Sequence, residues 1–211
     1  MKIAIIGATG HAGRAAVTAA QAQHIEVTAI VRHADKAHAL FGPELPVIEK
    51  NLMDLTKTDL AGFDAIIDFS APSPAYLHLD GAAKLVSMFR DQPNTRLFFI
   101  VGASSLFDAD GHMQLSETLS KYADQPWVAD LVESVHKLEF LKMVDNVAWT
   151  VMTPQDNFTD APQTQYRLGS NEVMLDKHGK AEVSTGNFAA ALVSELLSPE
   201  HIRQQFTVVN D

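Results

Sequence analysis

Three glycines at three-residue intervals follow a short apolar segment at the start of the chain, and no other feature constrains the fold as strongly. Residues 2–6 are nearly all apolar, as in a strand buried on both faces of a sheet. Gly7, Gly10 and Gly13 come next, and the alanine-rich residues 12–22 predict a helix, since Ala has the highest helix propensity. A strand, a glycine turn and a helix leave backbone N–H groups free at the helix N-terminus, where a pyrophosphate binds.

The glycine spacing predicts a dinucleotide site in this turn. Gly7 permits the tight turn, Gly10 lets the backbone approach the phosphates, and Gly13 lets the helix pack closely on the strand. The pattern is G-x-x-G-x-x-G rather than the G-x-G-x-x-G of many dehydrogenases, so an ordinary strand-to-helix turn is the alternative interpretation. Its place in the first such turn of the chain favours the dinucleotide. The predicted cofactor-binding positions here are Gly7, Thr9, Gly10, His11, Ala12, Gly13 and Arg14.

The residue after the second predicted strand indicates which dinucleotide binds. Residues 26–31 predict that strand, and it ends at Arg32 with no acidic residue. An acidic residue at this position accepts hydrogen bonds from the adenine ribose and favours NAD, whereas Arg suits the 2′-phosphate of NADP. Arg14 is placed to reach the same phosphate. The sequence therefore predicts NADP over NAD, with an exposed basic turn as the alternative.

The rest of the chain alternates strand-like and helix-like segments. Strands are expected at 46–49, 63–69, 96–101, 147–152, 173–175 and 206–209, and helices at 75–90, 127–144 and 187–197. Residues 106–126 are polar and predict a binding loop or lid, and Asn187 is expected to cap the last helix. The alternation predicts one Rossmann-like α/β domain with a doubly wound, mostly parallel sheet and helices on both faces. Residues 155–211 are expected to form the substrate side.

Ligands of such sheets bind beyond the carboxyl ends of the strands. The residues predicted to bind the cofactor there are Asp54, Leu55, Ser70, Ala71, Pro72, Gly102, Ala103, Ser104, Lys137, Thr153 and Pro154. Ser105, His136 and Lys137 are expected near the nicotinamide and are the candidate catalytic residues. Capping of a turn is the alternative for Asp54, and a merely packed or solvated side chain is the alternative for His136.

Composition excludes several other classes of protein. The formal net charge of −10 argues against nucleic acid as a partner, because phosphate binding needs a basic face. The chain has no cysteine, which excludes disulfides, thiol catalysis and cysteine metal sites, and its histidines are too scattered to predict any metal site. No apolar run approaches the ~20 residues that span a bilayer, and no export signal is evident. We expect a cytoplasmic protein without membrane contact, either monomer or dimer.

Several segments together resemble one known family. They are KIAIIGATGHAGR at 2–14, EVTAIVR at 26–32, VGASSL at 101–106, YRLG at 166–169 and HIRQQFTV at 201–208. The sequence resembles the atypical short-chain dehydrogenases/reductases of the NmrA-like group, in its candidate NADH–flavin reductase branch. It is more distantly similar to flavin/biliverdin-IXβ reductase, whose serine and His-Lys pair match Ser105, His136 and Lys137. The resemblance implies hydride transfer from NAD(P)H to a flavin or quinone-like acceptor, with flavin as substrate rather than prosthetic group.

One departure from the resembling family bears on the chemistry. Ordinary members use Tyr-x-x-x-Lys, in which the lysine lowers the tyrosine pKa and the tyrosine supplies a proton. No tyrosine here precedes a lysine by four residues, and Glu133 stands four residues before Lys137. Alcohol or ketone chemistry, which needs an acid on the substrate oxygen, is therefore disfavoured. Flavin reduction takes its proton from solvent and remains open, as does a non-catalytic NADP-binding redox sensor like NmrA.

Overall fold

The computed structural model describes residues 1–211, in which strands and helices alternate over the first half of the chain. The helices are α1 (His11–Ala22), α2 (Ala34–Phe41), α3 (Leu77–Phe89), α4 (Gln114–Tyr122), α5 (Val128–Lys142) and α6 (Thr185–Leu197), with short 3-10 turns η1 (Leu52–Asp54) and η2 (Ala103–Ser105). The strands are β1 (Lys2–Ile6), β2 (Glu26–Val31), β3 (Val47–Glu49), β4 (Ala65–Asp68), β5 (Arg96–Ile100), β6 (Ala148–Pro154), β7 (Asn157–Thr159), β8 (Tyr166–Gly169), β9 (Glu182–Ser184) and β10 (Gln204–Asn210). The structure contains no helix with the length and apolar character that a bilayer crossing requires.

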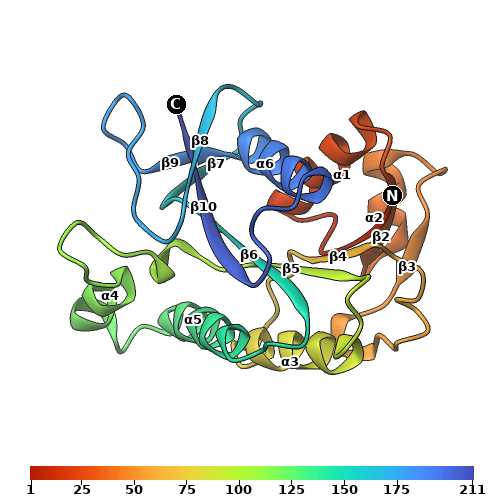
Figure 1. Cartoon of the computed structure of the whole chain (residues 1–211), viewed down its shortest axis with the longest axis horizontal. Helices are drawn as coiled ribbons and strands as arrows, with labels where there is room; N and C mark the ends of the chain where they lie inside the picture. Colours follow the sequence, from red (N-terminus) through yellow and green to blue (C-terminus); the bar gives the residue numbers. More distant parts are fainter.

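An eight-stranded sheet in the order β3-β2-β1-β4-β5-β6-β10-β8 forms the centre of the molecule (Figure 1). All neighbouring strands are parallel except β8, which runs antiparallel to β10. The chain winds from β1 outward to β3 on one side and from β4 onward on the other. The prediction of a doubly wound, mostly parallel Rossmann-like sheet is confirmed.

Helices cover both faces of this sheet, which explains why its strands are apolar throughout (Figure 1). Ile3 and Ile5 of β1 pack on the side of α1 and α6. Ala4 and Ile6, which point the other way, pack on the side of α3 and α5. The carboxyl ends of the parallel strands therefore share one edge between two helical layers.

Three local predictions differ from the structure. Residues 173–175 are not a strand; the chain there runs irregularly, and Val173 only donates its N–H to the carbonyl of Phe107. The last helix is capped by Ser184, whose side chain accepts from the N–H of Asn187, and Asn187 itself lies inside the helix. The polar segment 106–126 is not only a loop, because it contains helix α4.

A buried ion pair joins the sheet to α6 at the opposite edge from the carboxyl ends. The Arg96 guanidinium lies 2.6 Å from Glu195 Oε1 and also donates to the Thr150 hydroxyl at 2.8 Å. Glu195 further accepts from His201 Nδ1 at 2.8 Å and from the N–H groups of Glu200 and His201. Burial alone raises the pKa of Glu195, but the hydrogen bonds from His201 and Arg96 outweigh it and hold the pKa below its ordinary value of 4.5.

We expect Glu195→Gln to lower the free energy of unfolding by about 3 kcal/mol at pH 7, because Arg96 is left buried without its counter-charge. Since the folded pKa of Glu195 is depressed, its contribution is complete at neutral pH and declines as the pH falls below 4.5. Urea unfolding at several pH values measures both effects. The exposed pair of Glu139 and Lys142 supplies the control, and Glu139→Gln should cost less than about 0.5 kcal/mol.

Candidate functional site

The backbone of the turn between β1 and α1 packs as tightly against its neighbours as the glycines predict. Gly7 has φ +77° and donates its N–H to the carbonyl of Ile30 at 3.1 Å. A Cβ on Gly7 would lie 2.8 Å from the carbonyl oxygen of Phe69, so this turn touches the end of β4. A Cβ on Gly13 would lie 2.2 Å from the carbonyl oxygen of Gly7. Both positions therefore require glycine, for the turn and for the helix contact that follows it.

Helix α1 starts with unpaired amides. Gly10 is its N-cap and provides no side-chain cap, and no acidic residue occupies the first turn. The N–H groups of His11, Ala12 and Gly13 have no backbone acceptor, and the first bond inward is from Arg14 N–H to the Gly10 carbonyl. Free amides and the positive end of the helix dipole together favour an anion such as a pyrophosphate.

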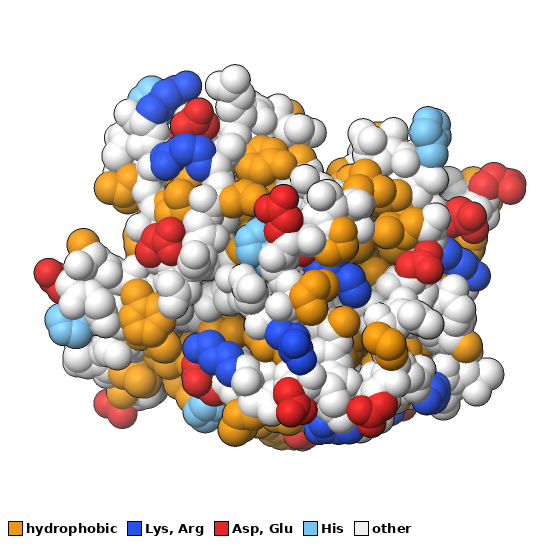
Figure 2. Space-filling model, in the orientation of Figure 1, with side chains coloured by type: hydrophobic (Ala, Val, Ile, Leu, Met, Phe, Trp, Pro, Cys, Tyr) orange, Lys and Arg blue, Asp and Glu red, His pale blue; other side chains and the backbone are white.

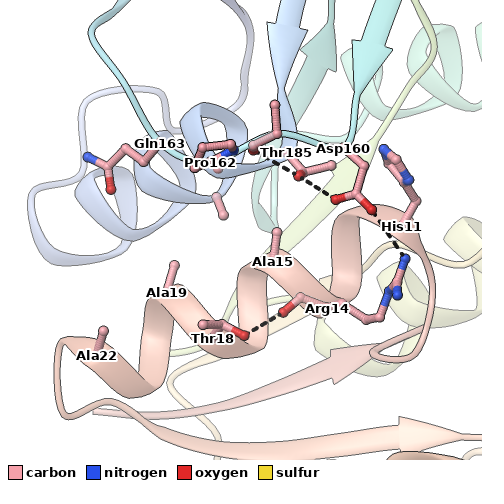
Figure 3. A pocket seen from close by; sticks show the side chains of 13 residues that line it. His11, Arg14, Ala15, Thr18, Ala19, Ala22, Asp160, Pro162, Gln163 and Thr185 are labelled. Atoms are coloured by element: carbon pink, nitrogen blue, oxygen red, sulfur yellow. Dashed lines mark hydrogen bonds and ion pairs between the residues drawn. The ribbon is translucent and has the colours of Figure 1, made fainter. Parts of the chain in front are cut away.

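The two arginines predicted to meet a 2′-phosphate lie in different surroundings. Arg32 follows β2 directly, is exposed and takes part in no ion pair. The guanidinium of Arg14 lies 3.8 Å from the carboxylate of Asp160, toward α6 (Figure 3). Arg14 borders a shallow groove of about 690 Å³ between α1 and α6, whose floor is formed by small residues of both helices. Of the two, Arg32 is the cation without a protein partner.

Several polar groups lie at the carboxyl ends of β4 and β5. Asp68 is buried and accepts from the N–H and the hydroxyl of Ser70, at 3.0 and 2.6 Å. Gly102 donates its N–H to the Ser134 hydroxyl of α5 at 3.3 Å. Ser104 is 7% exposed, and its hydroxyl has no hydrogen-bond partner. Such a group costs folding free energy unless a ligand or water satisfies it.

Ser105 occupies a different position from its neighbour. Its side chain is fully buried, donates to the Gly102 carbonyl at 3.0 Å and accepts from Gln205 Nε2 at 3.0 Å. Gln205 also donates to the Thr153 hydroxyl at 2.9 Å, so it ties η2 to β6. The structure thus leaves the hydroxyl of Ser104, rather than that of Ser105, without a partner.

Helix α5 directs Lys137 inward and His136 outward. Lys137 is 2% exposed, and burial lowers the pKa of its ammonium. The only opposing effect comes from the charge of Asp68, which raises this pKa. No hydrogen bond or ion pair reaches this ammonium. His136 is exposed, and its Nδ1 lies 3.3 Å from Glu133 Oε1. The predicted pair is therefore divided between the interior and the surface.

The other predicted residues line the wall of the site or lie behind it. Leu55 is buried in the core on the α3 side, and Asp54 accepts from the Asn51 side chain at 3.3 Å. Thr153 and Pro154 are buried in the last positions of β6. Ala71 and Pro72 follow Ser70 in the loop before α3. The role of each in binding a cofactor stays a prediction.

One buried polar residue near these strand ends, His78 in the first turn of α3, was not predicted. Its Nε2 is 3.8 Å from Asp130 Oδ1 of α5, and its Nδ1 is buried without a partner. Burial, and then the charge of Lys137, lower the pKa of His78. A signal was present, because His78 lies four, seven and eleven residues before Ala82, Leu85 and Phe89 and so shares their apolar face.

A doubly wound sheet with a glycine turn, unpaired helix amides and polar groups at the strand ends defines a dinucleotide-binding protein of the Rossmann type. Over residues 7–199 the chain matches the family model described as NAD(P)H-binding, and it belongs to that NAD(P)H-binding family. A candidate NAD-dependent epimerase/dehydratase from Bacillus halodurans, 15% identical with TM-score 0.79, has a similar fold. The resemblance to NmrA-like atypical short-chain dehydrogenases/reductases is confirmed.

Relatives match this chain over their full length. The uncharacterized protein YwnB of Bacillus subtilis is 32% identical over 216 residues, which cover 100% of this chain and 99% of that protein. A Lactobacillus casei protein of solved structure is 35% identical, with TM-score 0.94 over 100% of this chain and 99% of the other. A candidate NADH–flavin reductase from Streptococcus pneumoniae is 30% identical, with TM-score 0.86 over 100% of both chains.

We expect Lys137→Met to raise the free energy of unfolding by about 1–3 kcal/mol at pH 7, because it removes a buried ammonium without a partner. The folded pKa of Lys137 is lowered, so the unfolded chain binds more protons between that pKa and 10.5. The wild-type protein should therefore gain stability as the pH rises through this window, and the advantage of the variant should shrink. Thermal or urea unfolding from pH 7 to 10.5 measures it; an unchanged or lower stability of Lys137→Met would contradict the assignment.

Proposed function

We propose that this protein is an oxidoreductase that transfers hydride from NADPH to a flavin or quinone-like acceptor. The observation that carries the proposal is Glu133, which stands where the related dehydrogenases have their tyrosine, four residues before the buried Lys137. Glu133 contacts His136. No side chain described at the strand ends offers a tyrosine-like acidic hydroxyl to a substrate oxygen. A pyridine-nucleotide site of this kind suits an acceptor that needs no protein-bound acid.

The residues present fit the dinucleotide. The amides of the β1–α1 turn bind its pyrophosphate, and Ser104 and Lys137, both buried without partners, donate hydrogen bonds to ligand oxygens at the strand ends. NADPH, when bound, supplies the hydride. The proximity of Asp68 acts to raise the pKa of Lys137, against the effect of burial. These groups fix position and orientation, which is the main contribution that a protein makes to hydride transfer between two rings.

A flavin accepts the hydride at its ring, and solvent supplies the accompanying proton. The carboxyl edge of the sheet is open to solvent at Ala71 and Gly102, which are at least partly exposed. The space-filling view shows charges of both signs scattered over the visible face, with no field of one sign that would restrict the acceptor (Figure 2). The Streptococcus pneumoniae relative, described as a candidate NADH–flavin reductase, supports this class of acceptor.

The decisive experiment follows NADPH oxidation with riboflavin or FMN in excess, and with a quinone in parallel. Gly10→Asp should abolish turnover, because a carboxylate then occupies the place of the pyrophosphate beside the unpaired amides. Ala39→Asp, on the exposed side of α2, adds the same charge elsewhere and should leave the rate unchanged. Equal rates in the wild type and Gly10→Asp would refute the proposed site.

The absence of a tyrosine at 133 equally favours a second function, a redox sensor that binds NADP without turnover. The same assay separates the two. Tight binding of NADPH, measured by calorimetry, with no oxidation by flavins or quinones identifies the sensor and excludes the reductase.

Cofactor choice gives a further prediction. Because Arg32 is exposed and unpaired at the end of β2, we expect Arg32→Ala to weaken NADPH binding about 10- to 100-fold and NADH binding less than about threefold, as for the loss of a charge-assisted hydrogen bond. Arg14→Ala, which removes the arginine held by Asp160, is the matched variant and should discriminate less. Isothermal titration with both nucleotides measures this. Equal losses for NADPH and NADH in Arg32→Ala would remove the case for NADP.

A further inference from the structure

A carboxylate from the neighbouring strand lies at the start of α2, close to the residue that follows β2. Strands β2 and β3 are neighbours beside α2 (Figure 1), and Val31, the last residue of β2, pairs with Glu49, the last residue of β3. Arg32 continues directly from β2, and Ala34 begins α2 two residues later. Glu49 Oε1 accepts from the Ala34 N–H at 3.2 Å. The end of β2 itself has no acidic residue, but the fold brings one there from β3.

Glu49 supplies the only side-chain cap of this helix. His33 is the N-cap of α2, and its own side chain makes no capping hydrogen bond. The contact with Glu49 therefore satisfies the first N–H of the helix from outside. Glu49 Oε2 makes no hydrogen bond within the protein, and the residue is exposed. One carboxylate oxygen is thus held at the helix, and the other is free to meet a ligand.

The end of β2 is where the adenine ribose of a dinucleotide lies in folds of this type. A carboxylate oxygen accepts hydrogen bonds and has none to donate. The 2′-hydroxyl of NAD(H) donates to such a group, whereas the 2′-phosphate of NADP(H) is an anion that a carboxylate repels. Arg32 acts in the opposite sense, because a guanidinium attracts the phosphate. The corner therefore carries one group that favours each nucleotide.

We propose that Glu49 restricts the preference for NADP, because it accepts from the 2′-hydroxyl of NAD(H) through Oε2 and repels the 2′-phosphate of NADP(H). Arg32 and Glu49 are then opposing specificity-determining residues at the ends of β2 and β3. This role rests on the dinucleotide site of the proposed function and does not depend on the acceptor. Glu49 takes no part in hydride transfer.

The test removes the charge of Glu49 and keeps its contact with the helix. Glu49→Gln retains a side-chain oxygen for the Ala34 N–H, so it separates specificity from capping. Glu26→Gln is the control, because Glu26 is an exposed glutamate at the amino end of β2, at the opposite edge of the sheet. Calorimetry measures the dissociation constants of NADPH and NADH for the wild type and both variants.

We expect Glu49→Gln to bind NADPH about three- to tenfold more tightly, as for the removal of one like charge a few ångströms from the phosphate in solvent. The variant should bind NADH equally or more weakly, because a neutral amide is the poorer acceptor for the 2′-hydroxyl. Glu26→Gln should leave both dissociation constants unchanged.

Two adenosine fragments locate the effect. ADP and 2′-phosphoadenosine 5′-diphosphate differ only in the 2′-phosphate, and neither carries the nicotinamide. In Glu49→Gln the ratio of their dissociation constants should shift by the same factor as the ratio for NADH and NADPH. This factor should shrink as the salt concentration rises, because salt screens the repulsion between exposed charges.

Glu49→Ala tests the capping role separately. Loss of the cap should lower the melting temperature by about 2–4 °C, whereas Glu49→Gln should leave it nearly unchanged. The preference is a ratio of two nucleotides measured on one variant, so a partly unfolded fraction cancels from it. The gain of Glu49→Gln for NADPH should persist in the Arg32→Ala background, because Arg32 takes part in no ion pair with Glu49.

Several outcomes overturn the role of Glu49. These are a NADPH-to-NADH ratio that is unchanged or shifted toward NADH in Glu49→Gln, an equal shift in Glu26→Gln, and a gain that disappears in the Arg32→Ala background. A ratio shifted toward NADPH without any flavin turnover supports the role of Glu49 and refutes the reductase. Failure of the wild type to bind either nucleotide refutes both.

Discussion

The contact between the first turn and the end of β4 determines how the whole molecule is arranged. Gly7 leaves no space for a side chain against the Phe69 carbonyl, and Gly13 leaves none against Gly7 itself. Because this turn must approach β4 so closely, α1 starts directly above the point where the sheet reverses its winding direction. The unpaired amides of α1 and the polar groups at the ends of β4 and β5 consequently lie at the same edge of the sheet.

Buried polar groups have different partners at the two edges of the sheet. At the amino edge, Arg96 and Glu195 form short hydrogen bonds with each other and with their neighbours, although Arg96 Nε has no partner. At the carboxyl edge, the Ser104 hydroxyl and His78 Nδ1 have no partner, and no hydrogen bond reaches the buried Lys137. Unsatisfied buried groups cost stability, and the carboxyl edge carries more of this cost than the amino edge.

The sequence predicts the regular parts of this structure well, because both-face burial leaves a clear apolar record in β1, β2 and β5. Prediction from the sequence is wrong where a strand-like segment is short, or where two neighbouring residues are equally good helix caps. Residues 173–175 have strand-like composition, but only the N–H of Val173 bonds to a neighbouring backbone carbonyl, that of Phe107. Ser184 and Asn187 are both good caps three residues apart, so tertiary contacts decide between them. Among the site residues, the glycine turn follows from spacing, whereas the burial of Lys137 was not predicted. Which of Ser104 and Ser105 has a free hydroxyl depends on Gln205, a hundred residues later in the sequence than Ser105, and no local pattern contains that information.

The parallel arrangement also has a kinetic consequence. Ile3 of β1 pairs with Ala65 of β4, and Gln204 of β10 pairs with Thr150 of β6, so each of these ladders closes a loop of more than fifty residues. Closing such a loop costs chain entropy before the compensating contacts are formed. Folding is therefore slower in a protein with many contacts between residues far apart in the sequence. Until β10 pairs with β6, the apolar edge of β6 is exposed to other chains. The protein is most prone to aggregate during this stage of folding.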